Sequence, residues 1–350
     1  MMNNIHDTLI NWYTENQRNL PWRHEPTPYQ VWLSEVILQQ TRVNQGIDYY
    51  LRFVERWPSV TDLANASEEE VLKMWQGLGY YSRARNLYKC AKQVVEQYGG
   101  QFPSDFERLK KLPGIGSYTA AAIASIAFNL PHAVVDGNVY RVLARLYDLD
   151  LPINNNEGKK LFNQIADELL YRKQSGLHNQ ALMEFGALHC TPQNPNCMCC
   201  PLQVNCLAFA HQTVIQRPVK LQKTNVFTRY FNYLVIRLKD KIYLHKRNDN
   251  DIWRNLYDFP CIESGHPMTI EEVIASEEFK QLIENKPYAI NKVSPIFTHK
   301  LTHRIIQAQF IEIILEKKLL QIETKDLFLT RETDLGIFPI PRLIDLYLNT

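Results

Sequence analysis

The stretch Leu112-Pro113-Gly114-Ile115-Gly116 lies between two segments of helical periodicity and precedes Ser117-Tyr118-Thr119 and an alanine-rich run. Two glycines in a tight turn leave the backbone N–H groups at the start of the next helix unobstructed. A DNA phosphate can bind such a turn on the helix dipole, which makes Gly114 and Gly116 candidate DNA contacts. A plain connection between two helices also uses glycine, so this stretch alone leaves both interpretations open.

Helical periodicity extends outward from this turn, from Trp12 to about His211. Apolar residues recur there at spacings of three and four, and strand-like alternation is absent. Good helix starts occur at Ser67, which precedes three glutamates, and at Asn154 to Glu157. We therefore expect residues 1–210 to form an all-α region.

A change of pattern marks the end of this region. The segment 211–228 contains Arg217, Lys220 and Lys223 and no acidic residue, which is typical of a basic linker. Beyond it, Tyr230 to Leu238 and Lys241 to His245 are predicted to be two strands joined by a short turn. Ile305 to Leu315 is predicted to be a third strand. The sequence therefore predicts an α+β domain over 229–350.

Composition sets the broad class. The chain has 350 residues, 45% of them hydrophobic and 22% charged, and this length favours two domains. The net charge is only +2, so any nucleic-acid contact must be local. No apolar run reaches eighteen residues and the start does not resemble a secretory signal. We expect a cytoplasmic protein with no membrane contact.

Five of the seven cysteines lie between Cys190 and Cys206. Four thiolates can hold either a [4Fe-4S] cluster or tetrahedral zinc, and the spacing C-x6-C-x2-C-x5-C favours the cluster because zinc sites more often use two short knuckles. Cys199 is a spare thiol beside the third candidate ligand, and Cys90 and Cys261 are expected to be small buried hydrophobic residues. The candidate metal ligands are Cys190, Cys197, Cys200 and Cys206.

Two carboxyl groups have sequence environments that favour different protonation states. Glu35 lies in a predicted helix whose neighbours at three and four residues are mostly apolar, so burial should raise its pKa and keep it protonated. Asp136 precedes the helical spacing of Val139 to Leu146 and can cap that helix, which favours its charged form. A neutral acid and a fixed anion are what cleavage of a glycosidic bond requires. A structural cap and a solvent-facing glutamate are the alternative.

Several of these segments together resemble the helix-hairpin-helix DNA glycosylase superfamily and, within it, the adenine DNA glycosylases known as MutY. The resemblance implies a helix-hairpin-helix domain over about 21–130 and an iron-sulfur cluster domain made of 1–20 and 131–210, with one [4Fe-4S] cluster on the four cysteines. The matching stretches are Leu20-Pro21-Trp22-Arg23, Trp32 to Arg42, Gly77 to Asn86, Leu112 to Ala120, Val135 to Arg145 and the cysteine loop.

The resemblance also assigns roles in the reaction. It implies that Glu35 protonates N7 of adenine and that Asp136 stabilises the sugar cation. Tyr118 stands where bifunctional relatives carry a nucleophilic lysine. Tyrosine cannot form a Schiff base, so a monofunctional glycosylase is expected in which Tyr118 assists the cation.

Further positions match residues that contact DNA. Gln40 and Tyr80 correspond to residues that relatives insert into the helix when the adenine leaves the stack. Arg23 and Gln180 correspond to positions lining the adenine pocket.

Residues 229–350 resemble the Nudix-like domain that recognises 8-oxoguanine in this family. Phe297-Thr298-His299 occupies the place of a loop usually written Phe-Ser-His, and Thr298 keeps the hydroxyl that can bind the modified base. The Nudix box is missing, so metal-dependent pyrophosphate hydrolysis is not expected.

The sequence thus predicts a monomeric glycosylase that excises adenine opposite 8-oxoguanine or guanine in duplex DNA. A pyrimidine-specific glycosylase with lyase activity and a noncatalytic iron-sulfur protein are the alternatives.

Overall fold

The computed structural model describes residues 2–24, 26–221, 226–248, 250–284, 286–301, 303–319 and 326–350. Contacts between Cα atoms divide the chain into two compact units, one of Met1–Ala66 and Asn86–Gln222 and one of Ser67–Arg85 and Lys223–Thr350. Ser67–Arg85 thus groups with the second unit, although its sequence falls in the predicted helical region. The predicted boundaries at 210 and 228 stay predictions, and Lys223 of the linker lies outside the described residues.

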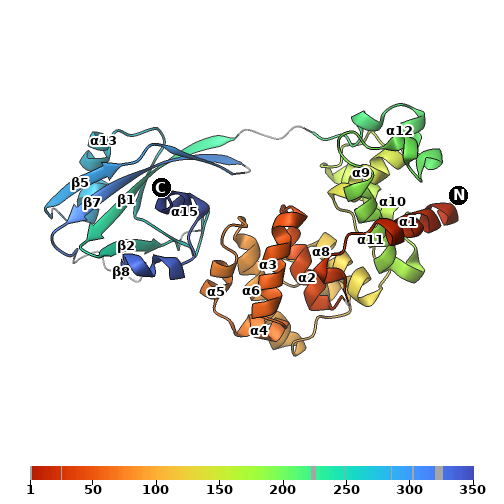
Figure 1. Ribbon diagram of the computed structural model, residues 1–350, viewed down its shortest axis with the longest axis horizontal. Helices are drawn as coiled ribbons and strands as arrows, with labels where there is room; N and C mark the ends of the chain where they lie inside the picture. Colours follow the sequence, from red (N-terminus) through yellow and green to blue (C-terminus); the bar gives the residue numbers. More distant parts are fainter. Residues whose placement is uncertain are drawn as a thin grey trace. The chain divides into compact units, whose positions relative to one another are not determined.

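The first unit is helical, as predicted (Figure 1). None of the described helices combines the length and apolarity that crossing a bilayer requires. The α-helices are α1 (Met2–Asn16), α2 (Pro28–Leu38), α3 (Val43–Arg56), α4 (Val60–Asn65), α6 (Ser82–Tyr98), α7 (Phe106–Lys110), α8 (Ser117–Ala122), α9 (Gly137–Leu146), α10 (Asn156–Leu169), α11 (Ser175–Leu188) and α12 (Leu207–Ala210). The short helical turns are η1 (Pro21–Arg23), η2 (Ile123–Ala127), η3 (Arg172–Gln174), η4 (Cys197–Cys199), η5 (Gln203–Asn205) and η6 (Val214–Gln216).

Side-chain caps explain where several helices begin. Thr27 accepts a hydrogen bond from the backbone of Gln30, whose own side chain accepts from the Thr27 backbone, so α2 starts with a capping box. Asn155 caps α10 by accepting from the backbone N–H of Gly158 at 2.6 Å. The helix starts predicted at Ser67 and at Asn154 to Glu157 are therefore confirmed.

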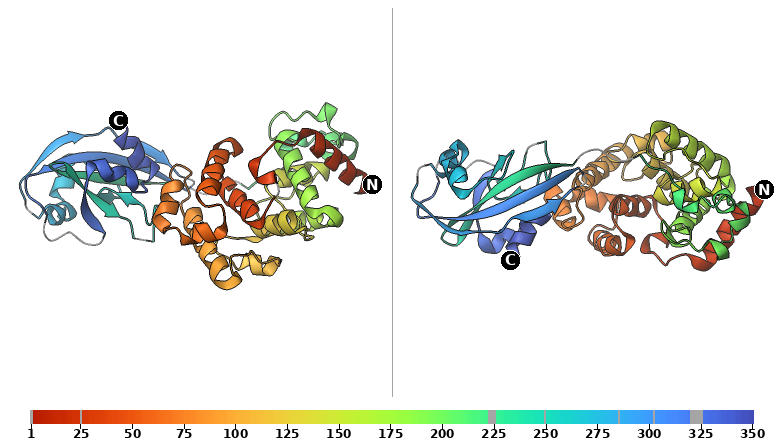
Figure 2. Two further views of the ribbon diagram at one scale, coloured as in Figure 1. Left: turned by 60° about the horizontal axis from the view of Figure 1, so that its bottom comes forward. Right: turned by 90° about the horizontal axis from the view of Figure 1, so that it is seen from above.

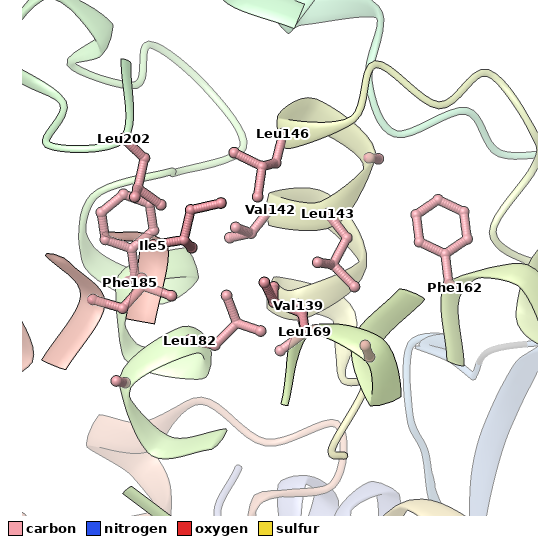
Figure 3. Packing of buried hydrophobic residues seen from close by; sticks show 14 of the residues in the cluster. Ile5, Val139, Val142, Leu143, Leu146, Phe162, Leu169, Leu182, Phe185 and Leu202 are labelled. Carbon is pink, nitrogen blue, oxygen red and sulfur yellow. The ribbon is translucent and has the colours of Figure 1, made fainter. Parts of the chain in front are cut away.

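One hydrophobic cluster joins the first helix to the end of the unit (Figure 3). Leu143 of α9 and Phe185 of α11 are buried in it together with Ile5 and Leu9 of α1. Each large apolar side chain stabilises the fold by about 1.5–3 kcal/mol when it is fully buried. Leu202, from the cysteine loop, also belongs to this cluster, so the loop is anchored on the same core.

The glycine-rich turn connects α7 to α8 as a helical hairpin, as predicted. Gly114 has φ 76°, a conformation that side-chain-bearing residues rarely adopt. A Cβ atom at Gly114 would lie 2.7 Å from Cβ of Asn86 on α6. Gly116 precedes α8 with φ −86° and open space around it, so only the first glycine is sterically required.

Replacing Gly114 with alanine is expected to destabilise the protein by about 2 kcal/mol, because strain in the left-handed region adds to a clash with Cβ of Asn86, which no side-chain rotation can move away. Urea unfolding followed by tryptophan fluorescence measures the loss. Gly116→Ala is the matched control and should lower the unfolding free energy by less than about 1 kcal/mol, the cost of alanine at the N-cap of α8. Equal losses in the two variants would contradict the steric argument.

The second unit combines α5 (Glu68–Met74) with a mixed sheet, as the α+β prediction requires. The sheet runs in the order β3-β2-β1-β7-β5, with β4 on β1, β6 on β7 and β8 on β2, and β1 pairs with β7 in parallel. All three predicted strands are confirmed. The strands are β1 (Phe227–Leu238), β2 (Lys241–Lys246), β3 (Tyr257–Asp258), β4 (Cys261–Ser264), β5 (Tyr288–Val293), β6 (Phe297–Lys300), β7 (Arg304–Leu315) and β8 (Leu327–Arg331).

Helices cover both faces of this sheet (Figure 2). Ile311 and Ile313 of β7 form a cluster with Phe279 from α14 (Glu277–Ile283), which follows α13 (Ile270–Ala275). On the opposite face, Phe310 stacks on Tyr347 of α15 (Arg342–Leu348), with ring centroids 4.0 Å apart. Alternate residues of β7 thus enter two separate cores.

Candidate active site

A cavity of about 440 Å³ lies in the first unit, between η1, α2, α8, α11 and the start of α9. It brings together the six predicted site residues that belong to this unit and were expected to contact the adenine, the sugar or the mispair. These are Arg23, Glu35, Gln40, Tyr118, Asp136 and Gln180. Side chains separated by more than 140 residues in sequence therefore share one space.

Glu35 lies on α2 with its carboxyl in this cavity. Burial raises the pKa of Glu35 to about 7, and the nearby charge of Asp136 also raises it. The hydroxyl of Tyr118 donates a hydrogen bond to the Glu35 carboxyl and partly opposes this shift. The predicted pKa rise is confirmed, so a substantial fraction of Glu35 carries a proton near neutral pH.

Asp136 is the N-cap of α9. Its carboxylate accepts hydrogen bonds from the backbone N–H of Val139 at 2.7 Å and from Nδ2 of Asn138 at 2.8 Å. Burial nevertheless raises the pKa of Asp136, and these two donors with the charge of Arg141 offset only part of the rise. The cap is as predicted, whereas the net direction of the pKa shift differs from what the cap alone suggests.

A partly buried chain of hydrogen bonds continues from Asp136 to the cysteine loop. Oδ1 of Asn138 accepts from Nη2 of Arg141 at 2.9 Å, and Nε of Arg141 donates to the carbonyl of Cys190 at 2.7 Å. The sequence shows Asn138 and Arg141 beside Asp136, but nothing in it indicates a partner 49 residues further along. Sequence reasoning therefore missed this connection.

Glu184 of α11 also lines the cavity, and sequence reasoning missed it. It is 1% exposed and accepts from Nη2 of Arg18 at 2.6 Å and from Nη1 and Nη2 of Arg23 at 2.9 and 2.8 Å. Burial would raise the pKa of Glu184, yet the hydrogen bonds from the two arginines lower it to about 2. Glu184 thus holds Arg23 in place as a permanent anion.

The predicted DNA contacts differ in where they lie: Gln40 and Gln180 line the cavity, whereas Tyr80, Gly114 and Gly116 do not. Gln40 is exposed at the end of α2 with φ 57°, and Gln180 lies on α11, where it accepts from the hydroxyl of Tyr13 at 3.4 Å. Tyr80 belongs to the second unit and is 46% exposed with φ 50°. Gly114 and Gly116 lie in the α7–α8 hairpin and do not line the cavity.

The four candidate metal ligands follow α11 in a partly buried loop, and none forms a disulfide. Across the residues that the structure describes, no group of three or more His, Cys, Asp or Glu side chains has the arrangement that holds a metal ion. The thiols are nonetheless near one another, because Cys200 interacts electrostatically with Cys190, Cys197 and Cys206. Four thiols are also the donor set that a [4Fe-4S] cluster uses, with one cysteine on each iron. Cys199 is exposed.

The resemblance to the family predicted a loop at Phe297-Thr298-His299. In the structure these residues instead form β6, which pairs antiparallel with β7. Strand alternation turns Phe297 and His299 toward the protein and leaves Thr298 exposed. The Phe297 ring lies 5.4 Å from that of Phe310, and the His299 ring 5.9 Å from that of Trp253. Thr298 is therefore the most exposed of the three residues, while Phe297 and His299 are half-buried.

Comparisons with known proteins agree with this architecture. Residues 33–169 match the HhH-GPD superfamily of base excision DNA repair proteins, and residues 232–350 match the NUDIX domain. The chain is 36% identical to the adenine DNA glycosylase of Buchnera aphidicola subsp. Baizongia pistaciae over 318 residues, which cover 89% of this chain and 87% of that one. It is 48% identical to the adenine DNA glycosylase of Mus musculus over 211 residues, covering 57% and 41% of the two chains.

Solved structures resemble the helical part. A thermostable thymine-DNA glycosylase superimposes with a TM-score of 0.55 at 28% identity, over 60% of this chain and 97% of that one. An endonuclease III solved in a non-covalent complex with DNA gives a TM-score of 0.52 at 24% identity, over 61% and 98% of the two chains. At this identity, the similarity to the endonuclease III structure shows a shared fold and nothing about activity.

Proposed function

The chain belongs to the adenine DNA glycosylase family, and on that premise we propose how its own residues release the base. It is an adenine-specific DNA N-glycosylase of base excision repair, a hydrolase of N-glycosyl bonds. The observation that carries the proposal is the shared cavity of Glu35, Tyr118 and Asp136. It offers a proton donor and an anion to one extruded base and its sugar.

In the proposed reaction, Glu35 gives its proton to N7 of the flipped adenine. Protonation makes the base a neutral leaving group, and the electron pair of the glycosidic bond leaves with it. A carboxyl with a pKa of about 7 suits this role, because it is protonated often enough and still releases its proton readily.

Departure of the base leaves a positively charged sugar. The Asp136 carboxylate stabilises this cation electrostatically, in a site where the low dielectric strengthens the interaction. Tyr118 holds the Glu35 carboxyl through its hydrogen bond and lines the cavity beside the sugar position. Water then adds to the cation and gives up a proton to the Glu35 carboxylate, which restores the acid, and no covalent enzyme intermediate forms through a lysine.

The excision rate should depend on pH through Glu35, whose protonated form is active. We expect a constant single-turnover rate below pH 7 and a fall of about tenfold per unit above it. Tyr118→Phe removes a hydrogen bond that lowers the Glu35 pKa, so the falling limb should move to higher pH. A rate that is flat from pH 6 to 9 in both proteins would exclude Glu35 as the titrating acid.

We further propose that Cys190, Cys197, Cys200 and Cys206 hold one [4Fe-4S] cluster. Four free thiols on one partly buried loop support this ligand set, and three of them, Cys190, Cys200 and Cys206, pack on the core of α1, α9 and α11. When bound, the cluster supplies a cross-link for a loop that contains little regular structure. The chain's own residues carry the reaction.

The variants Cys200→Ser and Cys199→Ser test which of these two adjacent cysteines binds the cluster. Because Cys200 is half-buried and interacts electrostatically with the other three thiols whereas Cys199 is exposed, only Cys200→Ser should lower the iron content and brown absorbance of the purified protein. Colorimetric iron analysis of both variants measures this. Iron loss confined to Cys199→Ser would reassign the third ligand.

The substrate we propose is adenine opposite 8-oxoguanine or guanine in duplex DNA. Arg23 and Gln180 line the cavity that receives adenine, while Gln40 at its rim and Tyr80 fill the space left in the stack. In the second unit, the exposed hydroxyl of Thr298 is the group proposed to bind the modified base, beside Phe297 and His299. The hairpin glycines Gly114 and Gly116 bind a phosphate.

One assay tests the activity and its rivals. End-labelled duplexes carry adenine opposite 8-oxoguanine, adenine opposite guanine or thymine glycol opposite adenine, and products are compared with and without alkali. Breaks at adenine only after alkali support a monofunctional glycosylase. Breaks on thymine glycol without alkali favour a lyase, and intact DNA throughout would indicate a noncatalytic protein.

A further inference from the structure

The segment Ser67–Arg85 leaves the first unit after α4 and returns to it within α6, yet its contacts belong to the second unit. It contains α5 and the turn from Gly77 to Tyr81. Tyr80 at the tip is 46% exposed, whereas its neighbour Tyr81 is 5% exposed. One aromatic residue therefore anchors the turn and the next one is presented outward.

The first set of contacts holds α5. The Glu69 carboxylate accepts a hydrogen bond from Nζ of Lys246 on β2 at 2.7 Å and another from the hydroxyl of Tyr257 on β3. Oε1 of Glu68 accepts from Nδ2 of Asn255 at 3.1 Å. The carboxylates of the first helical turn are thus bound by β2 and by the stretch leading into β3.

The second set holds the end of α5 and the base of the turn against residues 338–340. Nζ of Lys73 donates to the carbonyl of Phe338 at 3.0 Å, and the hydroxyl of Tyr81 donates to the carbonyl of Ile340 at 3.3 Å. At the start of α6, Nη1 of Arg85 donates to the carbonyl of Arg254 at 2.9 Å. The turn is therefore fixed on both sides.

Inside the turn, the backbone is strained and braced. Gly77, Gly79 and Tyr80 have φ angles of 98°, 73° and 50°. The Arg83 guanidinium lies 5.6 Å from the Tyr80 ring and 5.0 Å from the Trp75 ring, and Nε1 of Trp75 donates to the Gly79 carbonyl at 3.0 Å. A left-handed tyrosine persists only where its surroundings hold it.

We propose that the second unit positions Tyr80 for insertion into DNA, with Glu69 and Lys73 as positioning residues. The inference rests on the proposed function, because it assumes that Tyr80 fills the stack when adenine leaves. Contacts that fix the turn before binding remove the cost of ordering it on DNA. The unit proposed to read the oxidised base thereby also carries the side chain that enters the helix beside it.

The test uses the full-length protein in a Glu35→Gln background, so that DNA stays intact. The variant Glu69→Ala/Lys73→Ala removes one acid and one lysine from α5. The matched control, Glu277→Ala/Lys280→Ala, removes an exposed ion pair of the same charges from α14 of the same unit. A duplex with 2-aminopurine next to the mispair reports insertion by its fluorescence, and titration gives Kd.

We expect the α5 variant to weaken binding about tenfold and to lose most of the fluorescence rise, while the control keeps both. In a Tyr80→Ala background, the α5 substitutions should have no further effect. Equal thermal midpoints of the α5 variant and its control exclude unfolding as the cause.

The failures are distinguishable. If Tyr80→Ala alone leaves the fluorescence rise unchanged, Tyr80 is not inserted and that part of the proposed function fails. If Tyr80→Ala abolishes the rise but the α5 substitutions leave it intact, or their effects on Kd multiply with that of Tyr80→Ala, the positioning role is overturned.

Discussion

Glu35→Gln should lower the single-turnover rate of adenine excision by about a thousandfold, within the range that general acids contribute. Glutamine has the shape of glutamate, and its amide oxygen can still accept the Tyr118 hydrogen bond. It has no proton to deliver to adenine, so the base must leave as an anion. Rapid-quench measurement on the duplex with 8-oxoguanine, under enzyme excess, gives the rate.

Binding separates chemistry from recognition in this variant. Since the amide has the shape of the neutral carboxyl group and lacks only its acidic proton, Kd for an uncleavable duplex should stay within about threefold of the unsubstituted protein. Glu15→Gln makes the same exchange at an exposed position of α1 and should change neither quantity. Wild-type turnover by Glu35→Gln would remove Glu35 from the reaction.

Asp136→Asn is expected to lower the excision rate by about a hundredfold to a thousandfold, because it takes a full negative charge away from the sugar cation. Asparagine is also a good N-cap, so its side-chain oxygen can keep the hydrogen bond from Val139. The unfolding free energy should therefore change by less than about 1 kcal/mol. Single-turnover kinetics and urea unfolding of the same preparation measure both.

The control for Asp136→Asn is a substitution at the N-cap of another helix. Asn155→Asp changes the N-cap of α10, which lies outside the cavity, and should leave the excision rate unaltered. An Asp136→Asn protein that excises normally but unfolds more easily would reduce Asp136 to a structural cap.

Local signals in the sequence predicted much of the candidate site. Glu35 could be placed on a buried helix face because its apolar neighbours lie within one turn, and Asp136 because a cap precedes its own helix. The four cysteines stand in one short loop. In each of these cases the deciding contacts lie within a few residues along the chain.

Long-range contacts could not be predicted in this way. Glu184 binds Arg18 from 166 residues away, and Arg141 reaches the Cys190 carbonyl on another helix end. Ser67–Arg85 has a helical sequence, but whether α5 packs on helices or on a sheet depends on Lys246 and Phe338, far along the chain. Phe297-Thr298-His299 forms a strand because it pairs antiparallel with β7, which local sequence does not reveal.

The net direction of a carboxyl pKa shift also could not be predicted from the sequence, because burial and hydrogen bonding act on it in opposite directions. A cap lowers a carboxyl pKa and burial raises it, and the depth of the cavity decided the sign for Asp136. For Glu184 two arginines reversed the effect of burial.

The cluster that joins α1 to α9 and α11 has a consequence for how the chain is made. Ile5 and Leu9 leave the ribosome early, but Leu143, Phe185 and Leu202 follow more than 130 residues later. At synthesis rates of about 5–20 residues per second, the apolar stripe of the first helix stays uncovered for roughly 7 to 27 seconds before Leu143 is made. Until those partner helices are made, the nascent chain carries an exposed apolar surface of the kind that promotes aggregation.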